Sequence, residues 1–283
     1  MAYNENILDS LTFGFLGGGN MASALMEGLI SRGVPATSIC VAVPSENSRN
    51  RLATRLGVHA TETPDATFAN CDVIVLAVKP QQLRDAIASL KPFLNSAGLE
   101  SLVISVVAGA RLHDLQRWLG QMLLVRAMPN TPALVRSGMT GLAATPEICE
   151  QDRNIATAVM EAVGRCIWVE SDDQIDAVTA LSGSGPAYIF YFMEAMEYAA
   201  LELGLNAEQG RTLALETFRG ATALVAHSSE SLATLRERVT SKGGTTHAAI
   251  NSMDTDRVQA AFIRALHAAA ERGREMGLEL GLQ

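Results

Sequence analysis

The chain has 283 residues, of which 48% are apolar and 18% charged, with a formal net charge of −8 at pH 7. That length suits two domains of ordinary size, and the apolar fraction is ample for packed cores. The Lys and Arg residues form no long run, which argues against nucleic acid as a main partner because phosphate binding needs clustered cations. No window of about 18 uncharged apolar residues predicts a membrane span.

The four cysteines, Cys40, Cys71, Cys149 and Cys166, are scattered and form no C-x-x-C pair. Buried thiols in a reducing compartment are the simplest interpretation, and we expect neither disulfides nor a metal site. The first ten residues lack a basic start followed by an apolar core, so no signal peptide is expected. These features predict a cytoplasmic protein.

Apolar runs alternate with helical patterns in the first half of the chain. Strands are predicted at residues 11–16, 38–43, 71–78, 102–107 and 122–127, with helices at 20–33, 46–56 and 80–90. Continuous apolar runs are typical of parallel strands covered on both faces. We therefore predict an α/β fold with an N-terminal Rossmann domain, a doubly wound parallel sheet, over residues 1–169.

The second half shows helical periodicity, with no strand-like run after residue 172. Helices are predicted at residues 189–205, 208–227, 232–239, from 246, and at 257–280. We expect an all-helical C-terminal domain over residues 170–283. Its faces are rich in Ala, Gly and Met, which suits either packing within the domain or pairing with a second copy.

The sequence GGGNMA, residues 17–22, follows the first predicted strand and opens the next helix. It matches G-x-G-x-x-[GA] through Gly17, Gly19 and Ala22. Gly17 would permit the tight turn, Gly19 the approach of a pyrophosphate, and Ala22 the close packing of helix on strand. The helix N-terminus adds free N–H groups and a positive dipole. A dinucleotide site is predicted here, with a purely structural turn as the alternative.

The end of the second strand bears on which dinucleotide binds. An NAD site usually has an acidic residue there for the ribose 2′-hydroxyl. Residues 43–45 are Val-Pro-Ser, and Ser45, Asn47 and Arg49 could receive a 2′-phosphate, which favours NADP. Glu46 follows directly, and a shift of one position would place its carboxylate at the ribose.

Further loops follow predicted strands at the carboxyl edge of the sheet, where ligands bind in such folds. AVKP (77–80) and VVAG (106–109) would line the cofactor. MPNTPA (128–133) contains two prolines and would be a rigid wall for the nicotinamide end or a structural turn. LSGSGPAY (181–188) interrupts a helical stretch, which would allow either close approach of a ligand or tight helix packing.

The stretch TSKGGTTHAAI, residues 240–250, contains phosphate-loop residue types in the wrong order, since Lys242 precedes the glycines. The glycines would expose the backbone N–H groups from Gly243 to Thr246, and the following helix would point its N-terminus at them. Carboxylates bind such helix ends. We predict a carboxylate clamp, with a glycine turn capped by a Thr hydroxyl as the alternative.

The sequences FGFLGGGNMASAL, AVKP, RAMPNTPALV, DAVTALSGSGPAY and VTSKGGTTHAAI together resemble the pyrroline-5-carboxylate reductase family, in order and over nearly the whole chain. The resemblance implies reduction of 1-pyrroline-5-carboxylate to L-proline, the last step of proline biosynthesis, with NADPH preferred and NADH possible. It also implies a helical substrate-binding and dimerisation domain that intertwines with a partner subunit. The assembly would be a homodimer or a decamer of dimers.

The resemblance assigns roles to individual positions. With Ser45 from the strand-end argument, the expected cofactor-binding residues are Leu16, Gly17, Gly18, Gly19, Asn20, Met21, Ser45, Ala77, Val78, Lys79, Pro80, Val106 and Ala108. The expected substrate-binding residues are Gly243, Gly244, Thr245 and Thr246, with Thr246 as the catalytic residue that hydrogen-bonds the imine nitrogen. The chain departs from the family at Lys242, where Pro or Ser is common, and at Arg238, where some members have Asn.

Other functions fit the same plan of domains. One is another NADP-dependent imine or hydroxyacid reductase, but a β-hydroxyacid dehydrogenase would carry a catalytic Lys where residues 181–195 have none. The other is a nonenzymatic NADP-binding regulator, which would not be expected to have a second anion site like the one at residues 242–246.

Overall fold

The computed structural model describes residues 7–94 and 101–282, so the first six residues of the stretch inspected for a targeting signal lie outside the described residues. Contacts divide the described chain into two compact units. The first contains the residues up to Ser184 together with those from Ala269 onward, and the second is Gly185–Ala268.

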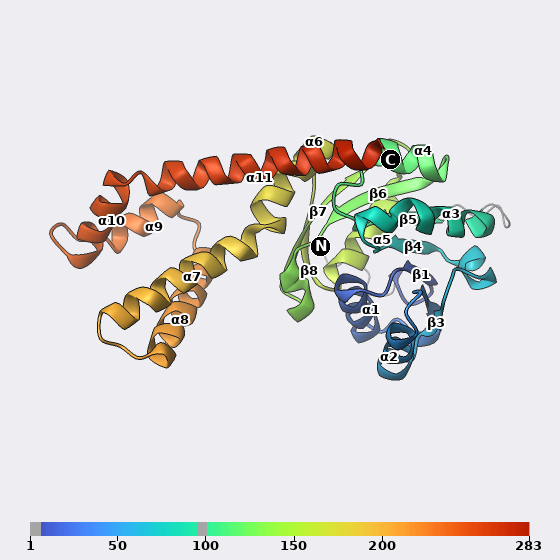
Figure 1. Ribbon diagram of the computed structural model, residues 1–283, viewed down its shortest axis with the longest axis horizontal. Coiled ribbons are helices and arrows are strands. Elements are labelled where there is room, and N and C mark those ends of the chain that lie inside the picture. The colour runs from blue at the N-terminus through green and yellow to red at the C-terminus, as the bar shows by residue number, and fades with distance from the viewer. Residues whose placement is uncertain (1–6, 95–100, 283) are drawn as a thin grey trace. The chain divides into compact units, whose positions relative to one another are not determined.

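An eight-stranded sheet forms the centre of the first unit, in the order β3-β2-β1-β4-β5-β6-β7-β8 (Figure 1). The strands are β1 Phe13–Leu16, β2 Ile39–Ala42, β3 His59–Thr61, β4 Val73–Leu76, β5 Leu102–Ser105, β6 Leu123–Met128, β7 Gly138–Ala144 and β8 Gly164–Trp168. Neighbouring strands pair in parallel except β6 and β7, which are antiparallel. The strand order reverses between β1 and β4, which is where doubly wound sheets bind their ligands.

Helices cover both faces of this sheet. They are α1 Asn20–Ser31, α2 Glu46–Leu56, α3 Leu83–Leu94, α4 Leu112–Leu119, α5 Glu150–Glu161, α6 Asp172–Val178 and the C-terminal end of α11 Val258–Gly281. Side chains of α1 and α5 share one buried cluster with strand residues such as Phe13 and Phe15. Side chains of α3, α4 and the end of α11 share a second cluster with alternate strand residues such as Ile74. This two-sided cover confirms the predicted doubly wound fold.

The sheet contains strands that the sequence did not predict, namely β3, β7 and β8. β3 has 3 residues and none of them is buried. β7 contains two glycines, Gly138 and Gly141, in 7 residues. β8 is an edge strand whose residues alternate between half-buried and exposed. None of these segments produces the continuous apolar run by which the other strands were recognised.

A buried ion network ties α6 to the sheet. Arg126 in β6 is 2% exposed, and its guanidinium lies 2.6 Å from a carboxylate oxygen of Asp172 and 3.0 Å from one of Asp176. The other oxygen of Asp176 lies 2.7 Å from Arg111. These contacts extend the first compact unit past residue 169, the predicted limit of the Rossmann domain.

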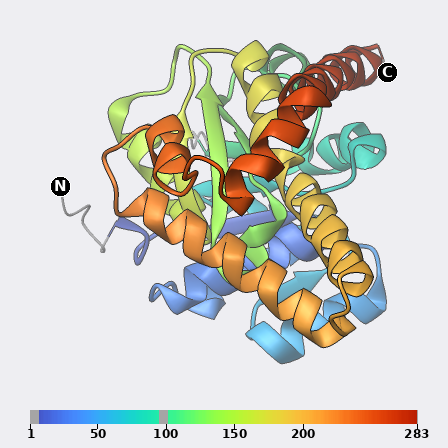
Figure 2. The same ribbon diagram turned by 90° about the vertical axis from the view of Figure 1, so that its left-hand side faces the viewer.

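The regular elements of the second unit are helices, and no strand follows β8 in the part of the chain that the structure describes, as predicted. The helices are α7 Gly185–Glu202, α8 Ala207–Ala226, α9 Leu232–Arg238, α10 Thr245–Thr255 and the first part of α11. Helices α7 and α8 form a hairpin, which Figures 1 and 2 show from two sides. The rings of Tyr188 and Phe192 on α7 pack edge-on against Phe262 of α11, with centroids 5.6 and 5.7 Å apart.

The helices of the second unit expose large apolar side chains. Phe190, Leu203 and Leu224 are 65%, 82% and 67% exposed in the single chain, and further exposed residues include Tyr191, Leu213 and Met253. An apolar surface of this extent is typical of a face that another subunit covers.

Candidate functional site

The carboxyl ends of β2, β1, β4 and β5 lie in register at one edge of the sheet, since their last residues pair with one another. The loops that follow begin side by side. The N–H of Gly17 donates to the last carbonyl of β2 at 2.9 Å, and that of Ala77 donates to the last carbonyl of β1 at 2.9 Å. The N–H of Val106 donates to the last carbonyl of β4 at 3.0 Å. The structure therefore brings the cofactor-binding positions expected from separate loops to one edge.

The three glycines of the first loop differ in how much space surrounds them. Gly17 has a φ of +105°, and a Cβ there would lie 2.5 Å from the carbonyl oxygen of Ala77, so only glycine fits. Gly18 is less strictly confined, because a Cβ there would lie 2.7 Å from a methyl group of the Leu52 side chain and its φ is ordinary. At Gly19, by contrast, no atom lies within 4 Å of the position that a Cβ would take. The loop thus keeps open space above Gly19.

The start of α1 fits the pyrophosphate that the motif predicts. Gly19 is the N-cap, no side chain caps the helix, and the first turn contains no acidic residue. The exposed Asn20 and the half-buried Met21 begin the helix, and Ala22 is fully buried against the sheet. Uncapped N–H groups at a helix N-terminus beside open space are a ready site for phosphate oxygens.

A cation lies at the end of β2. Arg49 donates through Nη1 to the carbonyls of Val43 and Pro44 at 3.1 and 2.6 Å. Ser45 is the N-cap of α2, where its Oγ accepts a backbone N–H at 3.4 Å, and Glu46 lies beyond it in the first helical turn. The guanidinium also lies 3.8 Å from the exposed carboxylate of Glu62, so a 2′-phosphate at this strand end would share Arg49 with that residue.

The loops after β4 and β5 are partly exposed at the same edge. Ala77, Val78 and Pro80 are half-buried, and Lys79 is exposed. In the loop after β5, Val106 and Ala108 are half-buried. Backbone and short side chains here leave surface that a bound cofactor could cover.

Asn130 fixes the loop after β6, a connection that sequence reasoning missed. Its amide nitrogen donates to the carbonyl and the hydroxyl of Ser182 at 3.1 and 3.2 Å, and its oxygen accepts the N–H of Met139 at 2.8 Å. Ser182 belongs to a π-helical turn, Thr179–Gly183, a feature frequent at functional sites. The only sequence signal was the position of Asn130 between two prolines.

The break in LSGSGPAY brings Gly183 against a side chain of β6. A Cβ on this residue would lie 2.9 Å from Cε of Met128, at the end of β6. Nothing lies within 4 Å of a Cβ placed on Gly185, so close packing is present at the first of these glycines, against a flexible methionine side chain, and absent at the second.

The predicted carboxylate clamp lies in the second unit, at the start of α10. Gly243 has a φ of +77°, and a Cβ on Gly244 would lie 2.6 Å from Oγ of Ser241. Gly244 is the N-cap, without a side-chain cap and with no acidic residue in the first turn. The alternative of a turn capped by a Thr hydroxyl is wrong, because the helix starts at Thr245 and the cap is a glycine.

The remaining residues of this loop are open to solvent. Thr245 and Lys242 are exposed, and Thr246 is half-buried. Arg238 is bound elsewhere, in an ion pair of 2.5 Å with Glu230. The start of α10 therefore presents bare N–H groups, the hydroxyl of Thr246 and a nearby ammonium group.

The cysteines are free thiols. Cys40 and Cys71 are buried with their sulfur atoms 3.6 Å apart, Cys149 is exposed and Cys166 is half-buried. Burial raises the pKa of the Cys166 thiol to about 11. Within residues 7–94 and 101–282, no group of three or more His, Cys, Asp or Glu side chains is placed to hold a metal ion. No helix in that part of the chain is long and apolar enough to cross a bilayer.

Family models match both halves of the chain. Residues 172–276 match the model for pyrroline-5-carboxylate reductase dimerisation, and residues 12–109 match that for coenzyme F420-dependent NADP oxidoreductase. The Pseudomonas aeruginosa pyrroline-5-carboxylate reductase is 41% identical over 268 residues, which cover 94% of this chain and 97% of that protein.

Solved structures show the same similarity. A pyrroline-5-carboxylate reductase from Coxiella burnetii is 42% identical, with a TM-score of 0.88 over 94% of this chain and 98% of the other. The Plasmodium falciparum pyrroline carboxylate reductase, solved with NADP bound, is 26% identical, with a TM-score of 0.84 over 95% and 99% of the two chains.

Proposed function

The chain belongs to the pyrroline-5-carboxylate reductase family, and on this premise we propose which of its residues carry the reaction. The protein is an NADPH-dependent oxidoreductase that converts 1-pyrroline-5-carboxylate to L-proline, the last step of proline biosynthesis. The imine carbon of the substrate accepts a hydride, and the imine nitrogen gains or already carries a proton. When bound, the cofactor supplies that hydride, and the protein supplies binding and orientation.

We propose that the edge of the sheet holds the cofactor. The N-terminus of α1 and the open space above Gly19 receive the pyrophosphate, as the uncapped first turn supports. Arg49 and Ser45, at the end of β2, receive the 2′-phosphate of NADPH. The loops of residues 77–80 and 106–108 line the nicotinamide half. NADH remains a possible but weaker cofactor, because it lacks the group that Arg49 would bind.

The start of α10 is proposed as the substrate clamp. The backbone N–H groups of Gly243, Gly244, Thr245 and Thr246 bind the carboxylate, and the hydroxyl of Thr246 hydrogen-bonds the imine nitrogen. A Thr hydroxyl is a poor general acid at neutral pH, so its role is to position the nitrogen. The proton comes from solvent or is already carried by the imine.

The protein is a homo-oligomer, which agrees with the dimerisation model and with the exposed apolar side chains of α7 and α8. We propose a homodimer or a decamer of dimers, to be settled by sedimentation velocity. We also propose residues 1–169 as the cofactor domain and 170–283 as the substrate and dimerisation domain, since the dimerisation match begins at residue 172. A cytoplasmic location stays a prediction, supported by the free thiols.

The observation that carries these assignments is that both α1 and α10 begin at a glycine cap with no acidic residue in the first turn. Steady-state assays would follow oxidation of NADPH, and then of NADH, by the nicotinamide absorbance in the presence of 1-pyrroline-5-carboxylate. No turnover with either cofactor would refute the activity and leave the nonenzymatic regulator. The ratio of kcat/KM for the two cofactors tests the role of Arg49.

Thr246→Ala tests the clamp. Losing a hydrogen bond to a charged nitrogen costs about 1.5–3 kcal/mol, so kcat should fall roughly 10- to 150-fold with little change in the Kd for NADPH. Thr255→Ala makes the same substitution at the other end of α10, where the hydroxyl bonds a helix carbonyl at 2.8 Å, and should leave kcat unchanged. An unchanged kcat in Thr246→Ala would remove this residue from the mechanism.

A further inference from the structure

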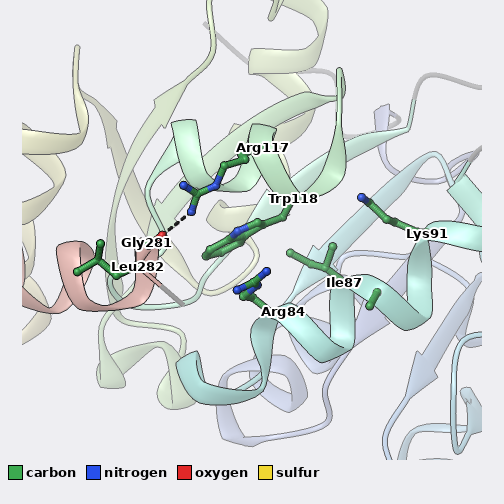
Figure 3. A pocket seen from close by; sticks show the side chains of 8 residues that line it. Arg84, Ile87, Lys91, Arg117, Trp118, Gly281 and Leu282 are labelled. Atoms are coloured by element: carbon green, nitrogen blue, oxygen red, sulfur yellow. Dashed lines mark hydrogen bonds between the residues drawn. The ribbon is translucent and has the colours of Figure 1, made fainter.

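A cavity of about 460 Å³ lies on the face of the first unit that is covered by α3, α4 and the end of α11 (Figure 3). Its lining residues are Arg84, Ile87, Ala88, Lys91, Arg117, Trp118, Gly281 and Leu282. None of these residues belongs to the proposed cofactor or substrate positions. The cavity is therefore a separate feature, for which the reductase reaction gives no reason.

The polar side chains that line this cavity are all hydrogen-bond donors, and three of them are cationic. Arg117 is partly neutralised by Asp114, with 2.9 Å between the charged groups, and also donates to the carbonyl of Gly281. Neither Arg84 nor Lys91 forms an ion pair with any residue in the part of the chain that the structure describes. Both side chains are exposed, so their charges are accessible to an anion from solution.

Trp118 lies against the two arginines of the cavity. The guanidinium carbons of Arg84 and Arg117 lie 5.9 and 5.7 Å from the centre of its ring, and Figure 3 shows the two side chains flanking the indole. Such contacts orient a guanidinium in advance of binding. Trp118 is itself only 7% exposed, so its ring offers no open face on which a base could stack. The site therefore suits a compact anion rather than a nucleobase.

The cations of α3 lie on the same side of that helix. Arg84 and Lys91 are two turns apart on one face of the helix, about 10 Å along its axis, with Ile87 and Ala88 between them. Arg117 reaches the same cavity from α4. Fork-shaped guanidinium groups beside an ammonium group match the several oxygens of a phosphate better than a single carboxylate.

We propose that this cavity binds a phosphate group, either as free inorganic phosphate or on a small phosphorylated metabolite without an aromatic base. Arg84 and Lys91 supply the unpaired charge, and Arg117 supplies further N–H donors. The site is distinct from the dinucleotide site at the N-terminus of α1.

The fluorescence of Trp118 would report binding. The chain has two tryptophans, so Trp168→Phe leaves Trp118 as the single reporter. Saturating NADP⁺ keeps the dinucleotide site occupied, and chloride keeps the ionic strength constant. Inorganic phosphate and glycerol 3-phosphate are titrated separately, and the tighter ligand identifies the source of the phosphate group. Equilibrium dialysis of radiolabelled phosphate with both tryptophans present repeats the measurement without the reporter substitution.

Two double variants make the test specific. Arg84→Gln with Lys91→Gln should weaken phosphate binding at least tenfold. Arg55→Gln with Arg274→Gln removes the same charge from exposed ion pairs outside the cavity and should leave the Kd within twofold. The proposal is overturned if neither ligand saturates, if the cavity variant binds phosphate as the wild type does, or if both double variants lose affinity equally.

Discussion

Gly19→Ala should separate cofactor binding from folding. Gly19 has φ −75° and ψ −173°, which alanine adopts freely, and its added Cβ would meet no atom of the chain within 4 Å. Replacing a glycine N-cap with alanine costs about 0.5–1 kcal/mol. Alanine also lowers the conformational entropy of the unfolded chain, which stabilises the fold by a similar amount, so the net change in the free energy of unfolding is near zero. The Tm should stay within about 3 °C of the wild type.

The cofactor should be affected far more than the fold. The same Cβ occupies the open space into which the pyrophosphate would come, and it would hold the phosphates away from the N–H groups of α1. Losing one charge-assisted hydrogen bond costs about 1.5–3 kcal/mol, which corresponds to a Kd for NADPH raised roughly 10- to 150-fold.

Gly17→Ala is the matched comparison two residues earlier. Its φ of +105° imposes about 1–3 kcal/mol of strain on alanine, and its Cβ would lie 2.5 Å from the carbonyl oxygen of Ala77. The backbone of Ala77 is hydrogen-bonded to β1 and cannot move away without breaking that hydrogen bond. This variant should lose stability as well as cofactor binding. The strain alone corresponds to a Tm lower by about 2–12 °C, and the collision with the Ala77 carbonyl adds to it.

Thermal unfolding at one protein concentration and NADPH binding by fluorescence titration would measure both variants. Equal protein concentrations matter because the stability of an oligomer depends on them. Binding of NADPH by Gly19→Ala within twofold of the wild type would refute the placement of the pyrophosphate. A wild-type Tm for Gly17→Ala would refute the packing argument instead.

Other consequences can be measured on the same protein. Asp176→Ala leaves two arginines at the sheet without this carboxylate, which should cost about 3–5 kcal/mol and lower the Tm by roughly 10 °C. Glu27→Gln breaks a partly exposed pair and should cost less than about 1 kcal/mol. Equal Tm values for the two variants would contradict the role of the network. Because burial raises the pKa of Cys166 to about 11, its thiol stays protonated at pH 8, and iodoacetamide should modify the exposed Cys149 first, with the rate at Cys166 rising as the pH approaches 11. Simultaneous labelling at pH 8 would contradict this. Lys242→Gln should raise the KM for 1-pyrroline-5-carboxylate several-fold at unchanged kcat if the ammonium group joins the clamp, and an unchanged KM would assign it to solvent.

The strands that could be predicted are those buried on both faces. β1, β2, β4, β5 and β6 lie inside the sheet with helices above and below, so each appears in the sequence as an apolar run. β3 and β8 lie at the edges and are covered only in part, and β7 contains glycines where a larger apolar residue would have been the signal. Burial on both faces, rather than strand propensity, therefore determined which strands could be predicted from the pattern of apolar residues.

Partners far apart in the sequence were beyond prediction. Arg126 stands in the apolar run LLVRAM, and a cation in a buried strand must have a counter-charge. The sequence predicts that such a partner exists, but residues 172 and 176 lie some distance along the chain and on a different element. The same holds for Asn130, whose bond to Ser182 depends on the packing of a π-helical turn against the end of β6.

The glycines show most clearly which features can be explained only with the structure. Gly17 is required by its φ and by a neighbouring carbonyl, and Gly243 is favoured by its φ of +77°, so the fold itself explains both. Gly19 and Gly220 have neither reason, since each has an ordinary φ and open space where a Cβ would be. Gly220 even lies inside α8, where glycine costs about 1 kcal/mol relative to alanine. A glycine that the chain does not need for its own packing leaves room for another molecule, and we propose the cofactor at Gly19 and another subunit at Gly220.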